Sequence, residues 1–180
     1  MFPNLIEVTD EKHKYFLSHA YKAAMELSDD PLTKVGAIIV DGDINPNRMM
    51  LRGANNVSRE VEGTQAELST RLRDRTWKYE NMIHAEHAVI SWAKDLGLDI
   101  KGKIMYMPWI PCNDCAQHII NAELGSLVTH FDMVKQTPER WHDSTNEALQ
   151  DLADHGIKCY TYTDQIEEFH SVFNGQVWFP

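Results

Sequence analysis

The sequence predicts an α/β protein in three layers, α/β/α, with helices on both faces of a mixed five-stranded sheet. Two observations predict this fold class. An apolar pair of strands lies within residues 35–54, and strands then alternate regularly with helices to the end of the chain. The sequence contains no internal repeat, and its 180 residues favour a single domain over 1–180 with one core.

A long helix and a hairpin come first. Thr9 or Asp10 can cap a helix over Glu11–Leu27, whose apolar residues recur at helical spacing. The β-branched run VGAIIV at 35–40 predicts a buried strand, because a short continuous apolar run is typical of strands covered on both faces. DGDINPN has the composition of a turn, so RMMLRGA at 48–54 is predicted as the antiparallel partner strand.

The rest of the chain alternates between helices and strands, with capping residues and glycines marking the boundaries. The predicted elements are a loop over 55–63, a polar helix over 65–78 capped by Thr64, a helix over 84–97, a strand over 103–108, a helix over 112–124 stopped by Gly125, a strand over 126–131, a helix from Asp143 or Ser144 to 155, a strand over 156–163 and a last helix over 164–173.

Composition restricts the function classes. The formal net charge of −10 disfavours a nucleic-acid polymer as partner, although a few cations in a pocket can still hold a small anion. No stretch is apolar for long enough to cross a bilayer, and the N-terminus lacks the pattern of a secretory signal. Three cysteines, two of them at metal-type spacing, fit a reducing interior, so a cytoplasmic protein without a membrane partner is expected.

Three side chains have the chemistry and spacing of a metal site. Cys112 and Cys115 lie on one turn at a predicted helix start, where the helix dipole favours the thiolate. His84 opens another helix and completes a set of three ligands, which is the number that a catalytic zinc uses while its fourth position stays free for water. Cys159 lies alone in a predicted strand and is expected in the core.

Glu86 lies two positions after His84, beside the expected metal. A carboxylate there can take a proton from water and return it to a leaving nitrogen. The alternative is an acidic residue that only stabilises the helix N-terminus. For the Cys pair, the alternatives are a redox dithiol or a closed structural zinc site with His87 as fourth ligand.

The order H-A-E and then P-C-x-x-C is the signature of zinc-dependent nucleobase deaminases. The chain resembles the cytidine and deoxycytidylate deaminase superfamily over most of its length, and within it the deoxycytidylate (dCMP) deaminase family. The resemblance rests on four stretches: DPLTKVGAIIV (30–40), RGANN (52–56), KYENMIHAE (78–86) and MPWIPCNDCAQHIINA (107–122). The sequence departs from the family pattern at Ala54, Asn56 and Ala88, where the family commonly has Tyr, Gly and Asn.

The resemblance implies a cytidine-deaminase-like fold, a catalytic Zn²⁺ held by His84, Cys112 and Cys115, and Glu86 as the proton shuttle. It implies that Asn55 contacts the sugar and that the turn with Asn56 lies near an allosteric nucleotide site. It also implies a homohexamer that dCTP activates and dTTP inhibits, each with Mg²⁺.

Other substrate contacts are predicted from the residues themselves. Ala85 lies within the H-A-E triplet, and Trp109 comes just before the metal turn, where it can stack on a base or pack in the core. One face of the helix 65–78 is expected to carry a cationic stripe, which either meets a phosphate or is solvated surface. The phosphate candidates are Lys34, Arg71, Arg75 and Lys78.

The function predicted from the sequence is hydrolytic deamination of dCMP to dUMP, which supplies dUMP for dTMP synthesis. Deamination of dCTP or of free cytidine is an alternative, and so is a transfer-RNA adenosine deaminase, against which the −10 charge argues. A structural zinc module is the non-enzymatic alternative.

Overall fold

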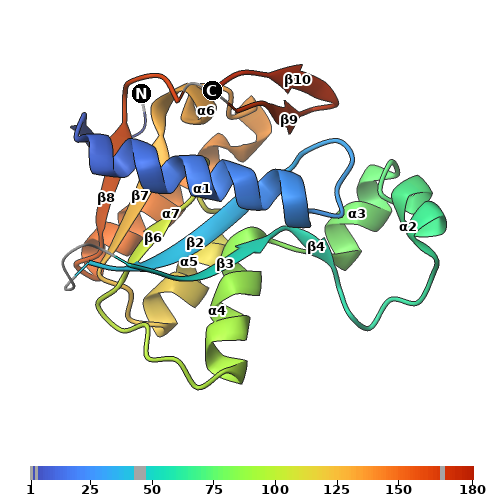
Figure 1. Cartoon of the computed structure of the whole chain (residues 1–180), viewed down its shortest axis with the longest axis horizontal. Helices are drawn as coiled ribbons and strands as arrows, with labels where there is room; N and C mark the ends of the chain where they lie inside the picture. Colours follow the sequence, from blue (N-terminus) through green and yellow to red (C-terminus); the bar gives the residue numbers. More distant parts are fainter. Residues whose placement is uncertain (1, 3, 43–47, 167–168) are drawn as a thin grey trace.

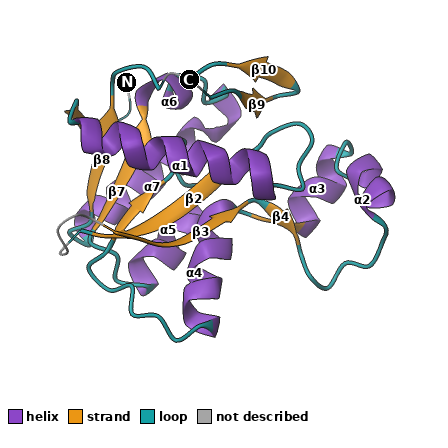
Figure 2. Cartoon of the chain, in the orientation of Figure 1, coloured by secondary structure: helices purple, strands orange, loops and turns teal. Residues whose placement is uncertain are grey.

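The computed structural model describes residues 2, 4–42, 48–166 and 169–180. A six-stranded sheet forms its centre. In spatial order the strands are β1 (Leu5–Val8), β8 (Lys158–Tyr162), β7 (Ser126–His130), β6 (Ile104–Tyr106), β2 (Gly36–Asp41) and β3 (Arg48–Ala54). The first four of these strands pair in parallel, and β2 pairs antiparallel with both β6 and β3. The predicted mixed sheet between helices is confirmed (Figures 1 and 2).

The sixth strand, β1, corrects the prediction of five. Leu5–Val8 pairs parallel with β8 at one edge of the sheet, with Leu5 opposite Cys159. The segment reads LIEV, four residues with an acidic side chain, which is too short for a clear period-2 pattern. The neighbouring strand determines its structure more than its own sequence does.

Helices cover both faces of the sheet (Figure 1). On one face lies α1 (Glu11–Leu27), which begins as predicted because the Asp10 carboxylate accepts a hydrogen bond from the Lys12 N–H. The other face carries α4 (Ala85–Asp95), α5 (Asn113–Asn121) and α7 (His142–Asp154). None of the helices in the described part of the chain is both long and apolar enough to cross a membrane.

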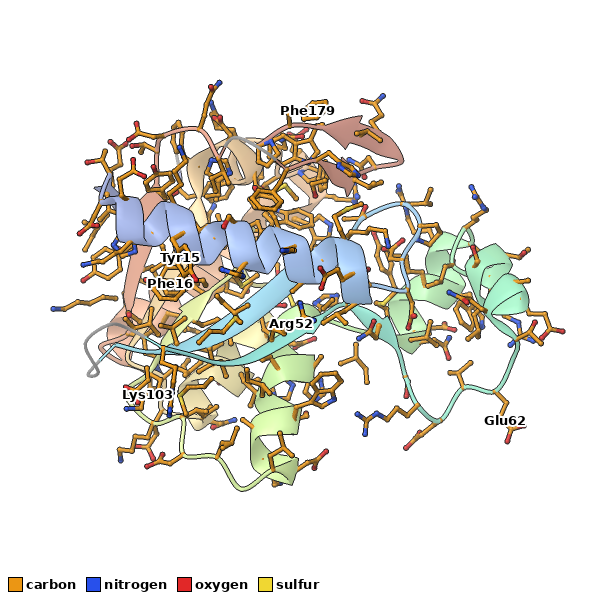
Figure 3. The ribbon with its side chains drawn as sticks, in the orientation of Figure 1. Tyr15, Phe16, Arg52, Glu62, Lys103 and Phe179 are labelled. Carbon is orange, nitrogen blue, oxygen red and sulfur yellow. The ribbon has the colours of Figure 1, made fainter. Side chains whose placement is uncertain are left out.

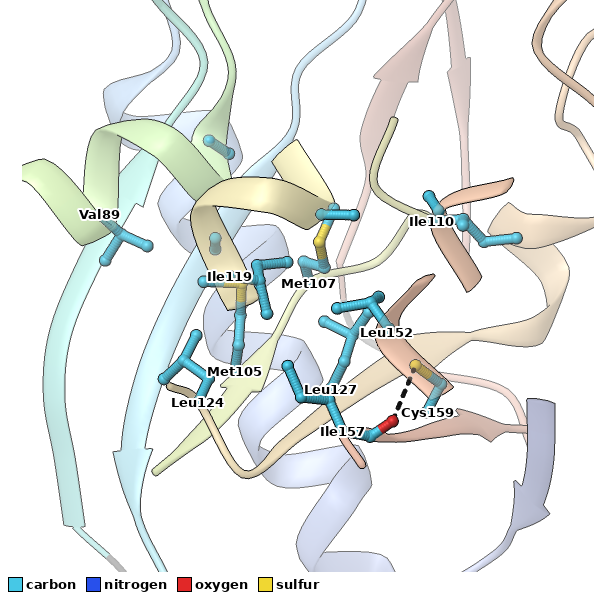
Figure 4. Packing of buried hydrophobic residues seen from close by; sticks show 14 of the residues in the cluster. Val89, Met105, Met107, Ile110, Ile119, Leu124, Leu127, Leu152, Ile157 and Cys159 are labelled. Carbon is cyan, nitrogen blue, oxygen red and sulfur yellow. Dashed lines mark hydrogen bonds between the residues drawn. The ribbon is translucent and has the colours of Figure 1, made fainter. Parts of the chain in front are cut away.

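Alternation along the strands divides the core into two halves. Ile38 packs in the cluster beneath α1, whereas Ile39 packs in the larger cluster beneath α4, α5 and α7. Figure 4 shows this larger cluster, in which Met105, Leu127 and Cys159 meet side chains of the helices. Cys159 is buried, and its thiol donates to the Ile157 carbonyl, so it belongs to the core as predicted.

Gly36 lets α1 lie directly on β2. A Cβ added there would lie 2.1 Å from the Ala20 carbonyl oxygen and 2.6 Å from the Ala24 nitrogen, both of them backbone atoms. We expect Gly36→Ala to lower the free energy of unfolding by about 3 kcal/mol, because the helix must move outward. Urea denaturation measures the loss. Gly53→Ala is the matched control, since its added carbon would meet the Val89 side chain at 3.3 Å and should cost clearly less. Equal losses would contradict this account.

The polar helix predicted over 65–78 is two helices, α2 (Gln65–Arg71) and α3 (Arg75–Asn81). Thr64 caps α2 with a capping box, as its sequence predicts. Asp74 starts a new helix because its carboxylate accepts hydrogen bonds from the Thr76 and Trp77 N–H groups. Arg71 therefore lies on α2 and Arg75 and Lys78 lie on α3, so the three predicted cations do not form a stripe on one helix.

The last predicted helix, over 164–173, is wrong. The chain forms the hairpin β9 (Ser171–Phe173) and β10 (Gln176–Trp178), turned by Asn174 and Gly175, whose φ angles are 51° and 77°. Asn-Gly is the residue pair that a two-residue hairpin turn prefers, because both positions need positive φ. That local signal outweighs the helical spacing of the residues before it.

Smaller differences concern element ends and short elements. The helix predicted over 112–124 ends at Asn121, and the predicted loop 55–63 contains the short strand β4. The predicted turn 41–47 lies mostly outside the described residues. Elements that the sequence did not predict are β4 (Asn56–Val57), its partner β5 (Met82–Ile83), α6 (Phe131–Val134) and the 3₁₀ turn η1 (Glu139–Trp141).

His130 is a buried histidine at the end of β7. Its Nδ1 lies 2.8 Å from the Tyr21 hydroxyl and its Nε2 lies 3.3 Å from the Asp164 carbonyl oxygen. The carbonyl can only accept, so Nε2 carries the proton and Nδ1 accepts from Tyr21. Burial lowers the pKa of His130 from 6.5 to about 4, although Asp132 partly offsets this effect.

This lowered pKa predicts a pH dependence of stability. A histidine that resists protonation in the fold contributes stability above pH 6.5, and that stability is lost as the pH falls from 6.5 towards 4. The loss for His130 amounts to about 3 kcal/mol at most. We expect His130→Asn to be less stable at pH 7 and to lose less stability between pH 6.5 and 4, as measured by urea denaturation at each pH. Tyr21→Phe keeps the buried imidazole and loses only the donor to Nδ1, so it should keep most of the wild-type slope. If His130→Asn keeps that slope too, His130 is not the titrating group.

Candidate active site

Two helix N-termini meet at one place in the fold. His84 is the N-cap of α4 and Cys112 is the N-cap of α5, and neither side chain caps its own helix. Cys115 lies in the first turn of α5. Both sulfur atoms lie 3.4 Å from the His84 Nδ1 atom, so three residues from two separate segments converge on one point.

The donor set fits a zinc ion. In the part of the chain that the structure describes, His84, Cys112 and Cys115 form the one group of three such side chains whose ligand atoms all lie within 4.8 Å of one another. A tetrahedral zinc with ordinary Zn–S and Zn–N bonds separates sulfur from nitrogen by about 3.5 Å. The observed 3.4 Å matches that separation.

The electrostatics of the cluster favour a thiolate. The hydrogen bond with Cys112 raises the pKa of the His84 imidazole to about 9, against the effect of burial. The pKa of the Cys112 thiol falls to about 4, first through its hydrogen bond with Cys115 and then through His84. The same bond, together with burial, raises the pKa of Cys115. Cys112 therefore gives up its proton first, and a thiolate is the form that binds a metal.

Glu86 lies in the first turn of α4 beside this cluster, with a residue exposure of 3%. Burial raises the pKa of its carboxyl group to about 6, while the nearby His84 charge works in the opposite direction. A carboxyl group with a pKa near neutral pH can accept a proton and also give one back. The arrangement suits a group that moves protons during a reaction.

A cavity of about 400 Å³ opens in front of these residues. Its walls come from the loop 30–35, the segment 72–82, the start of α4, the segment 107–112, the residues 140–145 and the turn of the C-terminal hairpin. The predicted site residues that line it are His84, Ala85, Glu86, Cys112, Asn55, Trp109, Arg75 and Lys78.

Asn55 lines the cavity, but both the oxygen and the nitrogen of its side-chain amide already form hydrogen bonds within the protein. The Oδ1 atom accepts from the Val35 N–H at 2.9 Å and from the Ser28 hydroxyl at 2.7 Å. The Nδ2 atom donates to the Thr33 carbonyl at 2.9 Å and to the Asp30 carboxylate at 3.4 Å. Asn55 thus holds the loop 28–35 in place. Its contact with a sugar stays a prediction, and that contact requires one of these four bonds to be exchanged.

Three of the predicted phosphate candidates have other partners. The Lys34 ammonium donates to the Ser28 carbonyl, and Lys34 does not line the cavity. Arg71 also lies outside it, because its guanidinium bonds the Glu62 carbonyl and lies over the Trp77 ring. Lys78 lines the cavity, and its ammonium pairs with the buried Asp30 carboxylate. Asn56, the allosteric candidate, accepts from the Asp29 N–H and does not line the cavity.

Trp109 forms a wall of the cavity and is held from two sides. Its indole N–H donates to the Thr137 hydroxyl at 2.7 Å, and the Phe173 ring meets it edge-on at 5.1 Å. The hairpin that carries Phe173 also bonds the loop 32–34, since the Lys34 N–H donates to the Val172 carbonyl and the Gly175 N–H to the Leu32 carbonyl. The C-terminal hairpin is therefore part of the site.

Several lining residues were missed by the sequence reasoning. Asp30 and Thr33 lie in the quoted DPLT stretch and Tyr79 lies in the quoted KYENMIHAE stretch, which offered a signal for them. No local pattern points to several other polar and aromatic lining residues, because segments far apart in sequence bring them together. These residues are Arg73, Arg140, Trp141 and Asn174.

Known proteins resemble this chain in sequence and in fold. The family model of the cytidine and deoxycytidylate deaminase zinc-binding region matches residues 10–131. The chain is 30% identical to the deoxycytidylate deaminases of Pongo abelii and Homo sapiens, over 73% of its own length and 67% of theirs. The fold resembles a crystal structure of dCMP deaminase from the cyanophage S-TIM5 in complex with dCMP and dUMP, with a TM-score of 0.60 and 17% identity over 86% of this chain and 98% of that one.

The family match and the deaminase relatives define an enzyme of the deaminase class, and the three convergent side chains and the buried carboxyl group fit that class. The chain belongs to the cytidine and deoxycytidylate deaminase family, as the match over residues 10–131 and the deoxycytidylate deaminase relatives show.

Proposed function

We propose that this enzyme hydrolyses dCMP to dUMP and ammonia, with Zn²⁺ held by His84, Cys112 and Cys115. One observation carries the proposal: the ligand atoms of these three residues lie within 4.8 Å of one another, and two of the residues, His84 and Cys112, line a cavity whose wall includes the buried Glu86. The deoxycytidylate deaminase relatives, which are 30% identical to this chain over the 67% of their length that it matches, support the choice of substrate.

Glu86 moves the protons in the proposed reaction. Bound Zn²⁺ supplies a Lewis acid that makes a water molecule nucleophilic near neutral pH. Glu86 takes a proton from the attacking water as the water oxygen bonds to C4 of the cytosine ring, and passes that proton to N3. Glu86 then carries the second proton to the exocyclic amino group, which leaves as ammonia while C4 becomes a carbonyl. The pKa of about 6 suits both transfers.

The rest of the cavity end suits a pyrimidine ring. Ala85 is the first residue of α4, so its backbone N–H has no acceptor within the helix and can donate to the carbonyl oxygen of the base. Trp109 presents an aromatic wall whose orientation Thr137 and Phe173 fix. We assign Ala85 to orientation of the base and Trp109 to packing against it.

The arrangement favours a catalytic zinc over a structural one. His87, the candidate for a fourth ligand, stacks on His118 with ring centroids 4.0 Å apart and is not a member of the group of close donors in the described part of the chain. A structural site closes its fourth position with protein, whereas a catalytic site leaves it for water or substrate. The position of His87 supports the open site.

A substrate panel tests the proposal. We expect the zinc-loaded protein to show its highest kcat/KM with dCMP, with dUMP as the product, and lower values with dCTP and cytidine. Transfer RNA should remain unmodified, because a polyanion is repelled by a chain of net charge −10. A preference for dCTP, for cytidine or for the RNA would replace the proposed substrate. The absence of any deamination would overturn the proposed activity.

Regulation and assembly are proposed from the family resemblance. We propose a cytoplasmic homohexamer that dCTP activates and dTTP inhibits, each with Mg²⁺, and a role in supplying dUMP for dTMP synthesis. The strand β4 begins with Asn56, which accepts from the Asp29 N–H, and the adjacent Asn55 holds the loop 28–35. An effector bound at Asn56 can therefore act on the cavity wall through this loop. Activity titrations with dCTP and dTTP, combined with light scattering, test regulation and assembly separately.

A further inference from the structure

Three arginines line the cavity, from two segments more than sixty positions apart in the sequence. Arg73 lies between α2 and α3, Arg75 is the first residue of α3, and Arg140 lies in η1. Tyr79 of α3 and Trp141 of η1 meet edge-on with ring centroids 5.9 Å apart. This aromatic contact joins the two segments, so that their arginines face one space.

These three guanidinium groups differ from the other basic groups around them. Within the described residues, none of the three makes a side-chain hydrogen bond or an ion pair. By contrast, Arg52, which is labelled in Figure 3, forms an ion pair with Glu26 near the end of α1, and Lys78 pairs with Asp30 inside the cavity. An acidic chain offers many carboxylates, yet these arginines are left without one.

The charges of the cavity are therefore unbalanced. Lys78 and Asp30 neutralise each other, which leaves three arginines against the single carboxyl group of Glu86. The whole chain carries −10, so this positive region is local. A neutral cytosine ring needs no such surplus, whereas a phosphate group binds arginine through paired, charge-assisted hydrogen bonds.

The charged side chains at the two ends of the cavity differ in exposure, and this difference defines how a ligand is oriented. Glu86 is 3% exposed, whereas all three arginines are exposed, so the carboxyl group lies deep and the guanidinium groups lie at the mouth. A ligand with a neutral ring at one end and an anionic group at the other fits this gradient in one direction only. Its ring reaches Glu86, and its anionic group stays among the arginines.

We propose that Arg73, Arg75 and Arg140 form an anion clamp that binds the 5′-phosphate of the substrate and makes the enzyme selective for a nucleotide over a nucleoside. This inference rests on the proposed function. Arg140 lies beyond residues 10–131, which the family model matches, so the clamp depends on a part of the chain outside that match.

The test compares dCMP with deoxycytidine. We expect Arg140→Gln to raise KM for dCMP about 10- to 100-fold, the effect of losing a charge-assisted contact, with kcat changed less than about two-fold. For deoxycytidine, kcat/KM should stay within about two-fold of wild type. Arg73→Gln and Arg75→Gln should act in the same direction. Arg71→Gln is the matched control, because Arg71 carries the same charge nearby but does not line the cavity.

Two results overturn the clamp. One is an unchanged KM for dCMP in all three variants, and the other is an equal loss for dCMP and deoxycytidine. If the wild type deaminates neither compound, the proposed function falls by itself. In that case the clamp is tested by the thermal stabilisation that inorganic phosphate gives to each protein. Phosphate should stabilise the wild type more than Arg140→Gln, and equal stabilisation would contradict the clamp.

Discussion

Glu86→Gln is expected to lower kcat for dCMP by about 1,000-fold or more while the protein keeps its zinc. General acid–base catalysis contributes about 10²- to 10⁴-fold, and Glu86 performs both proton transfers in the proposed reaction. Glutamine fills the same volume beside His84 but cannot accept a proton. Since Glu86 is not among the three clustered ligands, its exchange should leave the metal content near one ion per chain.

Steady-state kinetics and metal analysis of the same purified sample measure the two parts of this prediction. Glu80→Gln is the control, because Glu80 lies exposed on α3 and should keep wild-type kinetics. A Glu86→Gln enzyme that retains a tenth of the wild-type kcat would remove the proposed proton shuttle. A variant that loses zinc together with activity would show that Glu86 supports the metal site itself.

Cys115→Ala is expected to abolish both zinc retention and deaminase activity. The change removes one of the three proposed zinc ligands, a buried cysteine whose sulfur lies 3.4 Å from the His84 Nδ1 atom. We expect less than about one-tenth of an equivalent of zinc after dialysis, and activity reduced about 1,000-fold. Atomic absorption and the dCMP assay give the two readouts.

Cys159→Ala provides the matched control, because Cys159 is equally buried but packs in β8. It should keep zinc and activity and show only a small loss of stability. Circular dichroism of Cys115→Ala must resemble the wild type for the comparison to hold. Zinc affinity in Cys115→Ala equal to that of the wild type would contradict the proposed ligand set.

The central elements of the fold were predictable because their signals are local. The helix Glu11–Leu27 has a capping residue, Asp10. The sequence of β2 is an apolar run, and a turn-forming sequence separates it from its antiparallel partner β3. The clustering of His84, Cys112 and Cys115 was also predictable, since both the H-A-E and the C-x-x-C stretches start helices. A short motif at a helix start limits where its side chains can point.

The remaining parts depend on contacts that local patterns do not contain. Asp74 starts a second helix, and this break takes Arg71 out of the cavity while Arg75 stays in it. Arg140 has no motif around it and reaches the cavity because η1 packs against α3. In the C-terminal hairpin the Asn-Gly turn overrides a helix-like run, and Asn174 then joins the cavity wall.

The most direct test of the central claim is a zinc titration of chelator-treated wild-type protein, with dUMP formation from dCMP measured at each step. The account predicts that the stripped protein is folded and inactive, and that activity rises in proportion to added zinc until one equivalent per chain is bound. Deamination of dCMP at the full rate by protein that contains no zinc, or full occupancy of the His84, Cys112 and Cys115 site without any dUMP formed, would contradict it.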